Sequence, residues 1–220
     1  MQEMGTNKSN PKQLVVEGFQ DLYSVHGLMR AHIDWPDGKE NAPVWIEIGK
    51  SAEEILEPGY ISLKLKEPFT ETLGVILDAD TSPRGRYGRI RKQSIEIFPD
   101  LPDDIPLGGL IVENDDHKRL GVWIMPDNAS EGCLEVFLRH LVPNESEPIW
   151  QHATGSVVRA REIGASCREC HLPKAFLYTW LAWQDEPGQY PGTALTRRIL
   201  DPHAVSAASF VKWFRELYAL

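Results

Sequence analysis

The chain has 220 residues, of which 42% are hydrophobic and 25% are charged, so it is long enough to bury a sizeable core as a globular protein. Its formal net charge of −9 argues against a protein that coats nucleic acid without sequence preference, because such affinity comes from neutralising phosphates. An enzyme with a local cationic surface remains compatible with this charge.

The termini and the cysteines bear on where the protein works. Residues 1–12 are polar and lack the apolar stretch of a secretory signal, so we expect a flexible N-terminal tail. No apolar run is long enough to cross a bilayer, and three cysteines, an odd number, do not form a disulfide framework. We therefore expect a cytoplasmic protein with no membrane partner.

The first segments alternate between strand and helix patterns. Residues 13–16 are apolar and predict a strand that ends at Glu17, and residues 19–30 predict a helix that carries Asp21 in its first turn. After a loop rich in Pro, Gly and Asp, residues 44–48 predict a second strand, and Ser51 is typical of a helix N-cap.

The most informative stretch runs from Gly74 to Asp80. Residues 74–77 are apolar and β-branched, which predicts a strand buried on both faces. Asp78 and Asp80 follow it two positions apart, so both can point the same way at the carboxyl end of the strand, where open α/β sheets bind ligands. Two close carboxylates suit Mg²⁺. The plainer alternative is that the pair ends the strand and Asp80 caps the next helix.

Five cationic side chains follow the acidic pair within a dozen residues: Arg84, Arg86, Arg89, Arg91 and Lys92. An acidic pair that binds a metal beside a cationic run is what a phosphate-handling site requires. Arg84 and Arg86 lie nearest the acids and are the candidates for contacting the reacting phosphate. A solvated helix face is the alternative reading of this run.

The remainder of the chain becomes helical. We expect a helix over 86–97, an acidic loop over 99–106, and strands at 109–112 and 120–125 that form a hairpin at the edge of the sheet. Helices are expected from residue 133 onward, and those with defined bounds are 149–162, 174–184, 192–200 and 206–220. The order predicts an α/β fold, a mostly parallel sheet flanked by helices, with a core at 13–130 and a helical C-terminal extension at 131–220 packed on it.

A third strand end also carries an acid. Asp127 follows the strand at 120–125, and Glu135 lies in the helix that comes next. Because parallel strands present their carboxyl ends at one edge, Asp127 can converge with Glu17 and Asp78.

At these residues the chain resembles the toprim domain of topoisomerases, bacterial primases and overcoming-lysogenization-defect nucleases. The resemblance is closest to an uncharacterised bacterial group of toprim-like proteins. The segments that carry it are Val16–Asp21, Leu77–Asp80, Gly121–Asn128, Gly132–Glu135, Lys174 and Leu181–Gln184. Together these segments span most of the chain.

The resemblance implies a role for each candidate residue. Glu17 would be the general acid or base, and the ligands of Mg²⁺ or Mn²⁺ would be Glu17, Asp21, Asp78, Asp80, Asp127 and Glu135. Two such ions would stabilise both the attacking and the leaving oxygen. Lys174 would stabilise charge on the phosphate. Glu135 and Lys174 also fit exposed helix residues without a role in the reaction.

We therefore expect a metal-dependent nuclease that hydrolyses phosphodiester bonds of DNA or RNA. The resemblance implies a bacterial defence or toxin role with an ATPase partner, which must be a separate chain because no phosphate-binding Gly-rich loop is present. A second copy of the chain is a further candidate partner. Two alternatives stay open, namely a non-catalytic binding module and a phosphatase or transferase that acts on a small nucleotide.

Two other patterns are treated as coincidental or structural. Cys167, Cys170 and His171 match the haem-attachment motif and could supply three zinc ligands, but no second cysteine pair completes a site. Among the tryptophans, only Trp35 is expected to be exposed, and Trp183 is one of those expected in the core.

Overall fold

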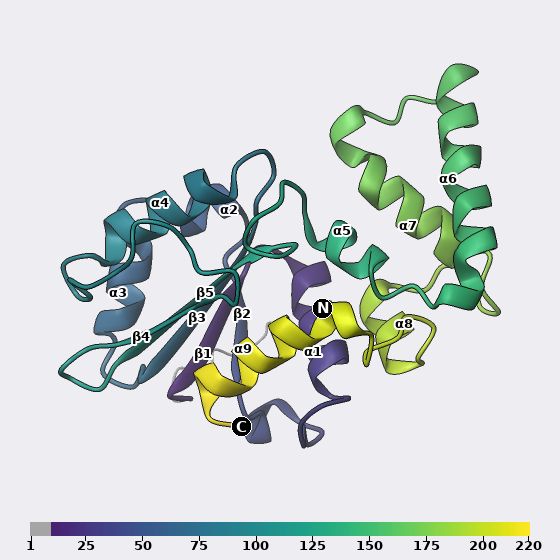
Figure 1. Cartoon of the computed structure of the whole chain (residues 1–220). Coiled ribbons are helices and arrows are strands. Elements are labelled where there is room, and N and C mark those ends of the chain that lie inside the picture. Colours follow the sequence, from purple (N-terminus) through teal and green to yellow (C-terminus); the bar gives the residue numbers. More distant parts are fainter. Residues whose placement is uncertain (1–9) are drawn as a thin grey trace.

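The structure is a computed structural model that describes residues 10–220, and it consists of a five-stranded sheet with helices on both faces (Figure 1). The strand order is β2-β1-β3-β5-β4, and all neighbours are parallel except β4 and β5. The strands are β1 (Lys12–Val16), β2 (Trp45–Ile48), β3 (Thr72–Asp78), β4 (Leu110–Glu113) and β5 (Arg119–Met125). The predicted α/β class, with a mostly parallel sheet flanked by helices, is confirmed.

Side chains that alternate along β1 and β3 explain the two helical layers. Leu14, Val16 and Ile76 face one core, while Val15 and Val75 face the other. The first core is closed by α1 (Phe19–Met29), α5 (Leu134–Arg139), α8 (Pro191–Thr196) and α9 (Ala208–Tyr218). The second is closed by α2 (Ala52–Ile55), α3 (Tyr60–Lys66) and α4 (Pro83–Ser94). Because β3 is buried on both faces, its carboxyl end is rigidly placed.

Of two local predictions near the sheet, the edge hairpin is confirmed and the start of one helix is wrong. The hairpin of β4 and β5 lies at the edge of the sheet, as expected. The helix after the acidic pair was expected from Arg86, but α4 begins three residues earlier, at Pro83. The reason is that the Ser82 hydroxyl accepts a hydrogen bond from the amide of Gly85 at 3.0 Å, and proline is favourable in the first turn of a helix.

The C-terminal part is helical, as predicted, and its longest helices form a hairpin. Helix α6 (Glu147–Glu162) and α7 (Leu172–Ala182) lie against each other and extend away from the sheet (Figure 1). Four short 3₁₀ turns complete the described chain: Lys39–Asn41, Asn144–Ser146, Glu169–His171 and Val205–Ala207. The start of α7 is thereby held beside the carboxyl edge of the sheet.

Helix α9 packs directly on the sheet because β3 and β5 carry glycine beneath it. A methyl group on Gly74 would lie 2.2 Å from the hydroxyl of Tyr218, and one on Gly121 would lie 2.3 Å from Leu217. The buried Tyr218 hydroxyl donates a hydrogen bond of 2.8 Å to the carbonyl of Gln13. This contact joins the last helix to the first strand.

The structure differs from the sequence-based expectations for the N-terminal tail and for two tryptophans. Lys12 is the first residue of β1 and not part of a tail, and residues 1–9 of the expected tail lie outside the described residues. Trp35 is buried, at 8% exposure, against His26 and Phe214, whereas Trp183, expected in the core, is 45% exposed. Within residues 10–220, no helix is both long and apolar enough to cross a membrane.

Candidate active site

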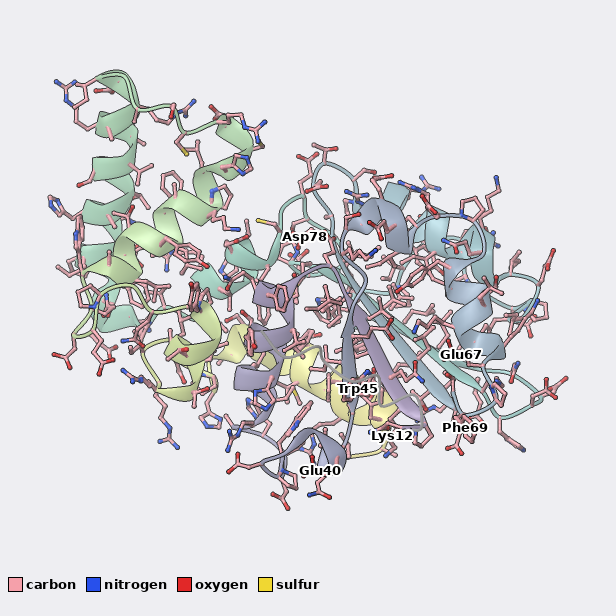
Figure 2. The ribbon with its side chains drawn as sticks, turned by 180° about the vertical axis from the view of Figure 1, so that it is seen from behind. Lys12, Glu40, Trp45, Glu67, Phe69 and Asp78 are labelled. Atoms are coloured by element: carbon pink, nitrogen blue, oxygen red, sulfur yellow. The ribbon has the colours of Figure 1, made fainter. Side chains whose placement is uncertain are left out.

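The carboxyl edge of the sheet opens into a hollow of about 660 Å³. Figure 2 labels Asp78 at this edge, where the sheet faces the α6–α7 hairpin. Six of the candidate residues line the hollow: Glu17, Asp21, Asp78, Asp80, Glu135 and Lys174. The structure therefore brings together acids from β1, α1, β3 and α5, together with one lysine from α7.

Glu17 and Asp78 are fixed by hydrogen bonds between elements. The Oε1 atom of Glu17 accepts a hydrogen bond from the backbone amide of Asp78 at 2.8 Å, which ties the ends of β1 and β3 together. The Oδ1 atom of Asp78 accepts one from the amide of Leu134 at 2.8 Å, which ties β3 to the start of α5. Within residues 10–220, the second oxygen of each carboxylate accepts no hydrogen bond.

Asp21 is positioned by its own helix. Its Oδ2 atom accepts a hydrogen bond from the amide of Gly18 at 3.0 Å, so it closes the first turn of α1. The side chain is buried, at 9% exposure. Because Gly18 directly follows Glu17, this turn holds Asp21 next to the general-base candidate.

The protonation behaviour of these acids reflects burial and crowding. Burial raises the pKa of Glu17 to about 7, and Asp21 and Asp80 add repulsion. Burial raises the pKa of Asp78 to about 9, with further repulsion from Glu17, Asp21 and Glu135. Burial likewise raises the pKa of Asp21 to about 6. In the described part of the chain, no salt bridge joins Glu17, Asp21 or Asp78 to a cationic side chain.

Asp80 lies at the rim and faces Arg86. Its backbone has a positive φ of 50°, and its amide and carbonyl pair with Gly132 at 2.8 Å each. Its carboxylate forms an ion pair with Arg86, which also contacts Glu53 at 3.0 Å. The ion pair therefore holds the Asp80 carboxylate toward the cationic helix α4.

The other three arginines of the cationic run are also paired with acids, whereas no ion pair of Lys92 is found among residues 10–220. Arg89 contacts Glu53 at 2.8 Å, Arg91 contacts Asp103 at 3.1 Å, and Arg84 contacts Asp104 at 2.9 Å. Arg84 does not line the hollow. Exposed ion pairs of this kind are weak, so an incoming phosphate can compete for the guanidinium groups.

Glu135 and Lys174 meet across the hollow. The Nζ atom of Lys174 lies 3.8 Å from Oε1 of Glu135, whose side chain is only 11% exposed. Tyr178 follows Lys174 by one helical turn, and burial and repulsion from Glu135 raise its pKa to about 12. The contact attaches the α6–α7 hairpin to the acidic cluster.

Asp127 does not join the cluster. Its side chain is exposed and closes its own turn, because its oxygens accept hydrogen bonds from the amides of Ala129 and Ser130 and from the Ser130 hydroxyl. It does not line the hollow, although it also follows a strand.

Sequence reasoning did not identify several residues that line the hollow: Gly18, Phe19, Gln20, Lys50, Ser51, Cys133, Leu134, Cys170 and His171. Cys170 and His171 belong to the Cys-x-x-Cys-His motif, but Cys167 does not line the hollow. His171 contacts Arg168 at 2.6 Å. Apart from this motif, the positions of residues 18–20 beside Glu17 and of residues 133–134 beside Glu135 could have indicated five of these residues.

The donor set fits a hard divalent cation in composition. Glu17, Asp21 and Asp78 supply carboxylate oxygens, which Mg²⁺ and Mn²⁺ prefer. Their burial without an ion pair raises their pKa values, so a bound cation would replace the protons that they otherwise retain. Across residues 10–220, however, no three His, Cys, Asp or Glu side chains are already arranged to hold a metal ion. Metal binding would therefore require these carboxylates to rearrange.

Comparison with known proteins gives one match. No curated protein and no solved structure matches the chain. The model of the family described as "Protein of unknown function (DUF3226)" matches residues 11–219, which include every strand of the sheet, every acid of the hollow and all of α9. The chain therefore belongs to the DUF3226 family.

Proposed function

We propose that the protein is a nuclease of the toprim type that hydrolyses phosphodiester bonds with the help of Mg²⁺ or Mn²⁺. One observation carries the proposal: Glu17, Asp21 and Asp78 are largely buried at the edge of a parallel sheet, share one hollow, and have no salt-bridge partner in the described chain. Purely structural acids are normally exposed or paired, because burying a lone charge is costly. A divalent cation supplies the missing charge.

The residues of the chain would divide the work as follows. Glu17, Asp21 and Asp78 would hold the cation, with Asp80 at the rim, and a bound cation would neutralise charge on the phosphate and lower the pKa of a water. Glu17, with a pKa near 7, can accept or release a proton near neutral pH. Lys174 would contact a phosphate oxygen. Arg86, expected at the reacting phosphate, does not line the hollow but pairs with Asp80 at its rim, so it would contact a flanking phosphate.

The exposure of the hollow favours a polymeric substrate over a small nucleotide. The side chains of Asp80 and Lys174, which both line the hollow, are 59% and 53% exposed. A small phosphorylated ligand would be better served by an enclosed pocket. The alternative of a binding module has support in the pairing of Asp80 with Arg86, which leaves the acids without a formed metal site.

The resemblance to toprim nucleases also suggests a separate ATPase chain as a partner, in a bacterial defence or toxin setting. The three cysteines are free thiols, which suits a reducing compartment such as the cytoplasm.

The test is cleavage of plasmid DNA, single-stranded DNA and tRNA in the presence of Mg²⁺, Mn²⁺ or EDTA. We expect metal-dependent cleavage that Asp78→Asn reduces to background. Asp127→Asn is the matched control, because Asp127 also follows a strand but turns away from the hollow. Equal activity of the Asp78 variant and the wild type would place the chemistry elsewhere. Calorimetry that detects no metal binding, together with no cleavage, would favour the binding module.

A further inference from the structure

Helix α1 carries two exposed aromatic rings, the first beside the acidic hollow and the second one helical turn further along. Phe19 is 61% exposed and lines the hollow, and Tyr23 is 52% exposed. Residues four apart lie on the same face of a helix, about 6 Å apart along its axis. Exposed aromatic rings are costly to leave in water. Two such rings on one helix face, beside a candidate catalytic site, therefore indicate a ligand with flat apolar faces.

The second ring borders another cavity. Tyr23 and His26 of α1 line a hollow of about 270 Å³, together with Trp35 and with Trp45 of the edge strand β2. The remaining wall is mainly apolar and comes from Leu22 of α1, from the loop residues 36–38, 42 and 44, and from Ile46 of β2. This volume lies just below the usual range for small-molecule sites, so it suits a single heterocyclic ring better than a larger ligand.

Polar groups in this cavity can form hydrogen bonds with the edge of such a heterocyclic ring. The imidazole of His26 packs edge-on against Trp35 with ring centroids 5.1 Å apart. Burial, together with the nearby Arg30, lowers the pKa of His26, so at neutral pH its ring offers one hydrogen-bond donor and one acceptor. Asp37, at the mouth, contacts Arg30 at 3.2 Å.

The two hollows border the same helix, α1. Figure 2 labels Asp78 at the carboxyl edge of the sheet and Trp45 below it, at the start of β2. Helix α1 runs from one to the other, because residues 19–21 border the acidic hollow, whereas Leu22, Tyr23 and His26 border the aromatic cavity.

We propose that a path formed by Phe19, Tyr23 and the cavity of His26, Trp35 and Trp45 binds a single strand of nucleic acid whose bases stack on the two rings and end in the cavity. The proposal rests on the proposed nuclease function, since it places the phosphates of that strand over the acidic hollow. It also deepens that function by naming the substrate class.

Charge and geometry favour a single strand over a duplex. A chain with a net charge of −9 gains little affinity from phosphates, so stacking has to supply much of the binding. Bases in a duplex are stacked on one another and hide their faces, whereas those of a single strand are available to aromatic side chains. Stacking also tolerates any base, so we expect little sequence preference.

The test is fluorescence anisotropy with a labelled single-stranded oligothymidylate and a labelled duplex, with Ca²⁺ in place of Mg²⁺ to limit cleavage. We expect Phe19→Ala and Tyr23→Ala each to weaken binding of the single strand about tenfold or more. Tyr23→Trp retains a stacking ring and should preserve affinity. Phe69→Ala is the matched control, because Phe69 is equally exposed, at 62%, at the opposite end of the sheet from Asp78 (Figure 2).

The outcomes separate this proposal from the nuclease itself. Failure of the oligothymidylate to bind, or equal affinity of the wild type and both alanine variants, would overturn the stacking path and leave this face to a protein partner. Metal-dependent cleavage in those same alanine variants at the wild-type rate would keep the nuclease and remove the path. Binding that depends on Phe19 and Tyr23 but without cleavage would support the path and count against the nuclease.

Discussion

Replacing Glu17 with glutamine should stabilise the protein in a way that depends on pH. Glutamine keeps the side-chain oxygen that accepts the hydrogen bond from the amide of Asp78, but it removes the charge. In the wild type, burial raises the pKa of Glu17 from 4.5 to about 7. Between these two values the folded protein holds a proton that the unfolded chain has lost. The free energy of unfolding of the wild type therefore falls as the pH rises through this window, and stays lower above it.

The size of the effect follows from the two pKa values. At about 1.4 kcal/mol per pKa unit, the difference between 4.5 and about 7 corresponds to about 3 kcal/mol, and partial access to solvent reduces this to about 2 to 3 kcal/mol. For a chain of 220 residues this amounts to an increase in melting temperature of roughly 5 to 10 °C. The gain should be complete above pH 8 and nearly absent at pH 4.

The assay is thermal or urea unfolding of the wild type and the Glu17→Gln variant across this pH range in EDTA. Glu96→Gln serves as control, because Glu96 is exposed and has no ion pair in the described chain, and it should show no such pH dependence. A difference between Glu17→Gln and the wild type that is constant with pH, or a variant less stable at pH 8.5, would refute the argument from burial.

Further predictions concern packing and stability. Gly192→Ala should cost about 1 to 3 kcal/mol, since the added methyl would lie 2.4 Å from the carbonyl oxygen of Tyr23; an unchanged urea midpoint would contradict this close approach of α8 to α1. Tyr218→Phe should cost about 1 to 3 kcal/mol because it leaves the carbonyl of Gln13 buried without its donor, and unfolding in urea measures the loss. Ser82→Ala should cost about 1 kcal/mol through the lost cap of α4, visible as a lower melting temperature, whereas Ser82→Asp should retain stability.

Much of the fold could be predicted because its signals are local. The apolar run of β3 marks a central strand, and the alternation of Leu14, Val15 and Val16 distributes side chains between two cores. Boundaries were less certain where two local signals compete. Gly85 and Gly88 weaken the helical pattern at the start of α4, yet the Ser82 cap begins the helix ahead of them.

The distant partners of the acids could not be predicted. Lys174 meets Glu135 only because the α6–α7 hairpin extends from the sheet and returns the start of α7 to the carboxyl edge (Figure 1). The exposure of Phe19 and Tyr23 is also a tertiary property. Their spacing fits a buried helix stripe equally well. Helix α8 approaches the backbone of α1 closely at Tyr23 and Gly27, yet both rings stay exposed.

Asp78 and Asp127 show most directly where sequence reasoning stops. Both follow a buried strand of a parallel pair, and both lie at the same edge of the sheet. Asp127 is followed by residues whose amides close a turn on its own carboxylate, a local arrangement that lowers its pKa despite partial burial. Asp78 instead accepts its hydrogen bond from Leu134, 56 residues further along, and lies among other acids. An acid at the end of a strand is thus a candidate for chemistry only when its neighbours in sequence do not already donate hydrogen bonds to its oxygens. Its oxygens can then contact residues that are distant in sequence and that the fold places nearby.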